Sequence, residues 1–154
     1  LSFTDEQAVA RIITAMAGRA AQKIYLKRVD TGASNDFEQA CDMARKMVTS
    51  WGMSRLGHIS VGDRGAAPMA GMGGGGHMSY GGNLQNEIDA EWRRIVAECD
   101  KIAHYIVETD KERMEHVTKT LLEQETILAP QWLEILAKFP SKVDPEKIRF
   151  NPAA

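Results

Sequence analysis

Residues 83–106, NLQNEIDAEWRRIVAECDKIAHYI, decide the fold. Apolar side chains recur in this stretch at steps of three and four residues, which is the spacing of one face of an α-helix. The stripe is long and narrow, a pattern typical of a helix that packs lengthwise along another helix. The sequence therefore predicts a helix over residues 83–109 with a seam made of Leu84, Ile88, Trp92, Ile95, Cys99, Ile102 and Ile106.

Two helical patterns precede this stretch. A capping-box sequence at Thr4–Gln7, with acids in the first turn, opens a predicted helix over residues 4–26. Asn35 is a favourable N-cap for a second helix over residues 35–51, and Gly52 stands where a C-terminal glycine cap belongs. Both patterns carry a continuous apolar stripe, so we expect both helices to bury one face.

Two more helices follow the central stretch. Thr109–Glu112 has the pattern of another capping box and precedes a predicted helix over residues 110–125. Pro130 opens a short predicted helix over residues 130–138. The connection between 83–109 and 110–125 is short, so we expect these two helices to form a long antiparallel hairpin. No segment alternates with a period of two residues, and the predicted fold class is all-α.

A glycine-rich segment, residues 57–82, interrupts the helical patterns. Loops of this length inside a domain are usually functional or mobile. Gly71, Gly73 and Gly76 formally satisfy GxGxxG, but no predicted strand precedes them, which argues against dinucleotide binding. The Gly-Lys-Ser/Thr of a phosphate-binding loop is also absent, so we expect no ATP site in this chain.

The composition narrows the class of protein. The chain has 154 residues, 44% of them hydrophobic, which fits one folded domain over residues 1–139 and an irregular, proline-containing tail over residues 140–154. The net charge is −2 with interspersed signs, so we expect no nucleic-acid partner. No apolar run is long enough for a membrane span. The sequence lacks an initiator methionine, so we expect a processed chain or a fragment. Cys41 and Cys99 lie on apolar helical faces, where we expect buried free thiols.

The metal-binding residue types are dispersed along the chain. The four histidines form no HExxH pair, and we expect His77 of the glycine-rich segment to be exposed. Two His/Glu pairs have a spacing of four residues, which usually marks a solvated helix face rather than a metal site: His104–Glu108 and Glu112–His116. Asp36 lies in the first turn of the helix at 35–51. From spacing alone, a favourable helix-dipole interaction of about 0.3–1 kcal/mol explains it.

Five short segments carry a more specific pattern. Residues 17–21 read AGRAA, residues 31–40 read TGASNDFEQA and residues 44–54 read ARKMVTSWGMS. After the glycine-rich segment, residues 87–95 read EIDAEWRRI and residues 121–127 read LLEQETI. In this order they resemble the GGRAAE, TGA-x-ND, AR-x-MV-x-x-WGMS, ID-x-EVRRI and LLE-x-ETL segments of the FtsH family of ATP-dependent zinc metalloproteases. The resemblance implies the C-terminal, helical part of the peptidase domain.

The resemblance gives Asp36 a second interpretation. The family holds a zinc ion with two histidines of HExxH and with an aspartate that corresponds to Asp36, which implies that Asp36 is the third zinc ligand. The HExxH glutamate would act as general base in peptide-bond hydrolysis by a zinc-activated water. The chain contains no HExxH, so zinc is expected only if that motif is supplied elsewhere. The sequence also departs from the family at Ala17, which replaces a glycine, and at Gln22, which replaces a glutamate.

Two functions are compatible with these observations. The missing HExxH favours a non-catalytic helical scaffold or subunit, derived from an FtsH-like domain and held in a larger assembly. The alternative is the C-terminal part of an active zinc metalloendopeptidase whose HExxH and ATPase parts lie on another chain or outside this sequence. In both cases we expect no activity from this chain alone, and protein partners in an oligomeric assembly, with a separate HExxH-bearing chain under the alternative. The resemblance implies a mitochondrial, plastid or bacterial membrane-associated location.

Overall fold

Helix α1 begins where the sequence places it. The structure, a computed structural model, describes residues 2–59 and 82–154. α1 spans Asp5–Ala21 and continues into a π-helical turn, η1, at Gln22–Leu26. Thr4 Oγ1 accepts a hydrogen bond from Gln7 N at 3.2 Å, and Gln7 Oε1 accepts one from Thr4 N at 3.0 Å. This reciprocal capping box confirms the predicted start of the first helix.

The other helices also follow the sequence pattern closely. A 3₁₀ turn, η2 at Thr31–Ala33, leads into α2 at Ser34–Thr49, and Gly52 takes the left-handed conformation (φ 63°) just beyond it. α3 spans Gly82–Thr109. The remaining elements are α4 at Lys111–Gln124, α5 at Ala129–Lys138 and a 3₁₀ turn, η3, at Pro145–Ile148. The described residues contain no strand, so the all-α class is confirmed.

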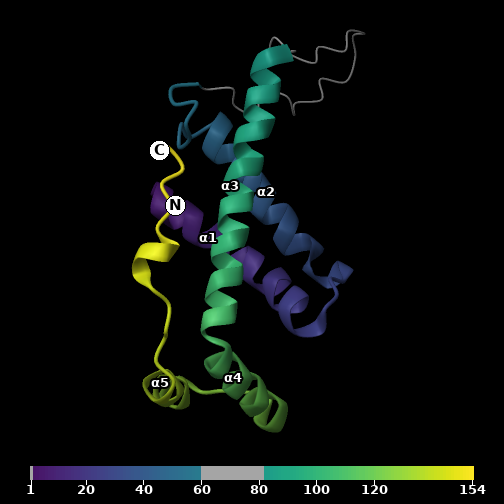
Figure 1. The fold of residues 1–154 in the computed structure, drawn as a ribbon, viewed down its shortest axis with the longest axis vertical. Helices are drawn as coiled ribbons and strands as arrows, with labels where there is room; N and C mark the ends of the chain where they lie inside the picture. The colour runs from purple at the N-terminus through teal and green to yellow at the C-terminus, as the bar shows by residue number, and fades with distance from the viewer. Residues whose placement is uncertain (1, 60–81) are drawn as a thin grey trace.

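The core lies between α1, α2 and α3. α1 and α2 pack on each other and both cross α3, the long vertical helix of Figure 1. The apolar seam predicted for α3 faces this core at Ile88, Ile95, Cys99 and Ile102, all of which are buried. The largest completely buried side chains in these helices are Ile12 of α1, Met47 and Val48 of α2, and Ile95 and Cys99 of α3.

Helix α4 does not form the expected long hairpin with α3. It turns away from α3 after Asp110, and the two helices meet only near that junction (Figure 1). Only Thr120 of α4 is buried, whereas Leu122 is 81% exposed. The seam of α3 is already covered by α1 and α2, so little of it remains for α4 to cover.

Trp92 consequently packs in another place than expected. As a seam residue it would face α4 in the predicted hairpin, but the Arg45 guanidinium of α2 lies 4.3 Å from the centre of its ring. Its Nε1 donates a hydrogen bond to Asp89 Oδ1 at 3.1 Å. The ring is half-buried and packs against the edge of the core. Trp92 therefore joins α3 to α2 at the edge of the core.

The segment 140–154 is irregular, as its prolines indicate, but it is docked. It leaves α5 and returns along α3 to the neighbourhood of the N-terminus (Figure 1). Asp110 Oδ2 accepts from Ser141 Oγ at 2.6 Å, and Asp110 Oδ1 accepts from Lys142 N at 2.8 Å. Pro152 is completely buried. This segment, residues 140–154, is called the tail below.

Candidate functional site

The connection from α1 to α2 is shaped by Asp30. The chain leaves η1 through Lys27 in the left-handed conformation, and Asp30 then caps the 3₁₀ turn at Thr31–Ala33. Asp30 Oδ1 accepts from Gly32 N at 2.9 Å and from Gln22 Nε2 at 2.9 Å. One carboxylate therefore ties the end of α1 to the turn that starts α2.

Asp30 is held in its ionised form. The hydrogen bond from Gln22, then the one from the Gly32 amide, and finally the nearby charge of Arg28 hold the pKa of Asp30 below its ordinary value. A glutamate in place of Gln22 would bring a second carboxylate against Asp30, whereas the glutamine amide donates to it. Glutamine at position 22, where the family motif has glutamate, therefore suits the hydrogen bond to Asp30 in this chain. Gln22 Oε1 is buried and has no hydrogen-bond partner among the described residues.

Asp36 lies in the first turn of α2, as predicted, and its side chain is exposed. It borders a surface pocket of about 320 Å³ between α1 and α2, lined also by Arg11, Thr14, Gln39 and Met43. Within residues 2–59 and 82–154, its carboxylate forms no hydrogen bond or ion pair. Both oxygens are therefore available to a partner outside these residues.

Neither of the two His/Glu pairs assembles a metal site. His104 Nδ1 lies 2.8 Å from the main-chain oxygen of Asp100, and the His116 ring stacks on Phe139 with centroids 4.4 Å apart. Glu112 pairs with Lys142 Nζ at 2.9 Å. In the described part of the chain, no three His, Cys, Asp or Glu side chains come together as a ligand set. His77 and most of the glycine-rich segment, including GxGxxG, lie outside the described residues.

The cysteines behave as core residues. Cys41 and Cys99 are both buried and free. Burial raises the pKa of the Cys99 thiol to about 12, and it also raises the pKa of Cys41. A thiol that stays protonated in an apolar core is a poor nucleophile and a poor metal ligand, so neither cysteine belongs to the candidate site.

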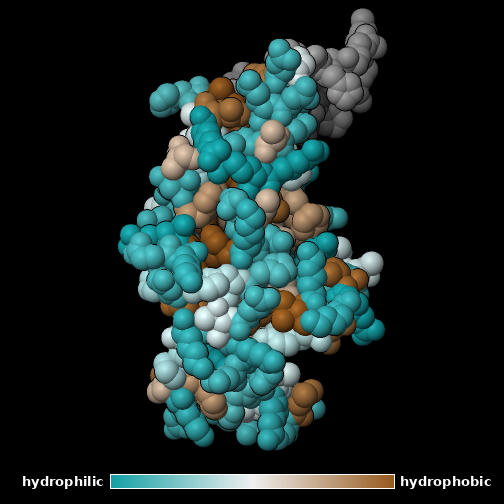
Figure 2. All heavy atoms as spheres, viewed as in Figure 1, coloured by the Kyte–Doolittle hydropathy of each residue, from teal (hydrophilic) through white to brown (hydrophobic). Residues whose placement is uncertain are grey.

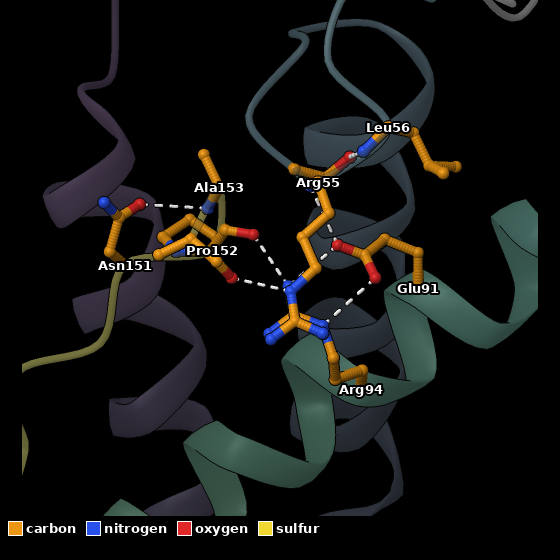
Figure 3. Close-up of polar contacts among 9 residues, drawn as sticks. Arg55, Leu56, Glu91, Arg94, Asn151, Pro152 and Ala153 are labelled. Carbon is orange, nitrogen blue, oxygen red and sulfur yellow. Dashed lines mark hydrogen bonds and ion pairs between the residues drawn. The ribbon is translucent and has the colours of Figure 1, made fainter.

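No sequence pattern singled out Glu91, which accepts more hydrogen bonds than any other acid among the described residues. Its carboxylate accepts from Arg94 Nε at 3.0 Å and Arg94 Nη2 at 2.7 Å, and from Arg55 N at 2.9 Å. Figure 3 shows Glu91 between Arg94 and the turn after α2, with Asn151–Ala153 approaching from the opposite side. Glu91 is only 7% exposed. The sequence does place Glu91 and Arg94 three residues apart, within the segment that resembles ID-x-EVRRI. That spacing on a helix usually indicates an ion pair at the surface, so it did not predict a buried one.

Glu91 should give the protein a measurable acid sensitivity. The hydrogen bonds from Arg94, followed by the one from the Arg55 amide, lower the pKa of Glu91 below the value it has in the unfolded chain. Its contribution to stability is therefore complete above the unfolded-state pKa and is lost as the pH falls through the lower, folded-state pKa. We expect the stability gap between wild type and Glu91→Gln to be constant above about pH 5 and to narrow below it. Urea unfolding across this range tests the prediction, and a gap independent of pH would contradict it.

Comparison with known proteins agrees with the segments quoted from the sequence. A family model described as peptidase family M41 matches residues 1–135. The chain is 35% identical over 130 residues to the ATP-dependent zinc metalloprotease FtsH of Bacillus subtilis, which covers 83% of this chain and 20% of the relative. It is 36% identical over 151 residues to FtsH of Mycoplasmopsis pulmonis, covering 97% of the chain and 20% of the relative. The chain thus spans about a fifth of the length of these relatives.

Proposed function

Because the chain belongs to peptidase family M41, we propose that it is the helical, Asp36-bearing part of a zinc metallopeptidase domain. The observation that carries this proposal is the state of Asp36, an exposed carboxylate without a partner among the described residues, beside a surface pocket. An oxygen ligand on a rigid helix, free of competing bonds, fits one position of a tetrahedral zinc site. Zinc held by such ligands supplies Lewis-acid activation of water for peptide hydrolysis.

The protein's own part in that site is to place one ligand. Asp30 fixes the turn before α2, and the packing of α2 on α1 fixes the helix itself, so the position of the Asp36 backbone is set before any metal binds. Three protein ligands are needed, and the HExxH histidines would supply the other two. The proposal therefore requires a second segment that docks beside Asp36, at the pocket between α1 and α2.

A non-catalytic scaffold is the second candidate. The departures at Ala17 and Gln22 favour it, because they alter a segment of the family next to the α1–α2 connection. The missing HExxH carries less weight, since the chain matches only 20% of the length of its relatives. Both candidates imply a larger protein assembly, at a mitochondrial, plastid or bacterial membrane-associated location.

The surface and helices are compatible with an assembly role. Apolar residues on the face drawn in Figure 2 form separate patches among hydrophilic ones. The most exposed large apolar side chains of α4, α5 and the link between them are Leu122, Leu128 and Leu133, at 65–81% exposure. None of the helices in residues 2–59 and 82–154 has the length and apolar character to cross a bilayer.

Zinc analysis with matched variants tests the proposal. We expect the native assembly purified through this chain to contain stoichiometric zinc, and Asp36→Asn to lose at least about tenfold in zinc affinity. The isolated chain should bind none stoichiometrically, because it lacks the other ligands. The control is Asp42→Asn on the same helix, whose exposed carboxylate pairs with Arg45 at 2.9 Å. A zinc-free assembly that forms equally well with Asp36→Asn would support the scaffold instead.

A further inference from the structure

The tail is bound in the manner of a peptide ligand. Between residues 149 and 154 it forms no helix or strand, and its main-chain oxygens accept hydrogen bonds from side chains of other elements. Arg94 Nη2 donates to Pro152 O at 2.7 Å, and Arg55 Nε donates to Ala154 O at 2.6 Å. Side-chain donors directed at an extended backbone are a common way to hold a peptide without relying on its sequence.

Two tail side chains supply the sequence-dependent contacts. The Phe150 ring packs against the core, and the Arg94 guanidinium lies 5.5 Å from its centre. Pro152 is completely buried, whereas the intervening Asn151 and the following Ala153 are exposed. The pattern that the site recognises is therefore an aromatic residue, one solvent-facing residue and a proline.

The receiving side is ordered by bonds that do not involve the tail. Glu91 holds the Arg94 guanidinium through two hydrogen bonds and also accepts from the main-chain N–H of Arg55. Glu91 thus orients the guanidinium of Arg94 and ties down the main chain of Arg55, from which the second donor extends (Figure 3). A site whose donors are already oriented loses little further entropy when a peptide binds.

The contact between the tail and the helical core is incomplete. A groove of about 970 Å³ lies between α1 and the tail, lined by Val9, Ile13, Ile148 and Phe150 among others, so the tail is anchored at points rather than packed throughout.

We propose that Arg55, Glu91 and Arg94 form an acceptor site for an extended peptide of the pattern aromatic–x–proline, which this chain fills with its own residues 150–152. This site is separate from Asp36 and does not depend on zinc. When the tail leaves, the site accepts the same segment from a second copy of the chain. The tail is then an exchangeable strap rather than a fixed part of the core.

Binding of a peptide to a strap-released variant tests the proposal. The variant Phe150→Ala/Pro152→Ala removes both anchors from the tail and leaves Arg55, Glu91 and Arg94 unchanged. The probe is a fluorescent peptide of residues 148–154 with blocked ends, followed by anisotropy. We expect saturable binding to the variant and at least about tenfold weaker binding to wild type, whose own tail competes at high effective concentration.

Single substitutions in the protein and in the peptide distinguish specific binding from nonspecific binding. In the released background, Arg55→Ala should weaken binding by roughly tenfold, because it removes one charge-assisted hydrogen bond. A peptide with Arg149→Ala should bind as well as the natural one, since the Arg149 side chain is 77% exposed. A peptide with Pro152→Ala should not bind measurably.

Two results would overturn the proposal. If circular dichroism shows that the released variant has lost its helices, the tail is an integral part of the core. If the variant keeps its helices and still binds no peptide, the aromatic and proline anchors do not define an acceptor site. Equal binding of the natural and Pro152→Ala peptides would count against it in the same way.

Discussion

Replacing Arg94 with alanine will lower the free energy of unfolding by about 3 kcal/mol. Removal of one partner from a buried ion pair leaves the other charge without compensation, which typically costs about 3–5 kcal/mol. The lower end applies here because 20% of the Arg94 side-chain surface remains exposed to solvent, against 9% of the Glu91 side-chain surface. The variant also leaves the main-chain oxygen of Pro152 without its donor. Chemical denaturation at neutral pH measures the loss.

Arg93 provides the control for Arg94, because it is the adjacent arginine on the same helix and is exposed. Arg93→Ala should change stability by no more than about 0.5 kcal/mol. The double variant Glu91→Leu/Arg94→Met should recover part of the loss, since removing both charges removes the uncompensated one. If Arg93→Ala and Arg94→Ala lower the free energy of unfolding equally, the buried ion pair contributes no more to stability than an exposed arginine does.

Replacing Ile95 with alanine will cost about 2–5 kcal/mol, the range for a fully buried isoleucine. Ile95 is completely buried on the seam of α3, in the core between α1, α2 and α3. These helices are anchored to one another by many other buried side chains, so the backbone can close only part of the space left by the deletion. The missing methyl and methylene groups should therefore leave a cavity, and thermal unfolding should occur at a lower temperature.

The milder substitution Ile95→Val calibrates this effect. Removing one methylene should cost only about 0.5–1.5 kcal/mol, in proportion to the smaller volume lost. Leu122→Ala on α4 provides a surface comparison, because Leu122 is 81% exposed and should be almost neutral. An Ile95→Ala loss below that of Ile95→Val would mean that the core closes around the deletion.

Helix positions were predictable because the information for them is local. The period of the apolar side chains and the caps at Thr4 and Gly52 depend on residues within one or two turns. The structure accordingly begins α1 at Asp5 and places Gly52 at a positive φ. The exposure of Asp36 in the first turn of α2 follows from the same local pattern.

Hydrogen bonds between residues far apart in the chain could not be predicted from the sequence. Thr109–Glu112 has the pattern of a capping box, yet no side chain caps α4 in the structure. Asp110 instead accepts two hydrogen bonds from Ser141 and Lys142, more than 30 residues further along the chain. Glu91 is an acid on a helix, and only the turn after α2 and the tail distinguish it from a solvated one. The zinc-ligand role of Asp36 depends in the same way on a segment beyond these residues.

The composite nature of the tail site sets an order of events during folding. The hydrogen bond between Arg55 and Ala154 joins residues 99 apart in the sequence. Forming it early would cost the entropy of closing a long loop and would gain only one hydrogen bond. The acceptor exists only after α3 has packed beside the turn that follows α2. We therefore expect the tail to dock after the helices have assembled and to detach before they separate. The partly unfolded state of lowest free energy is then a helical core with a free tail, populated reversibly under native conditions.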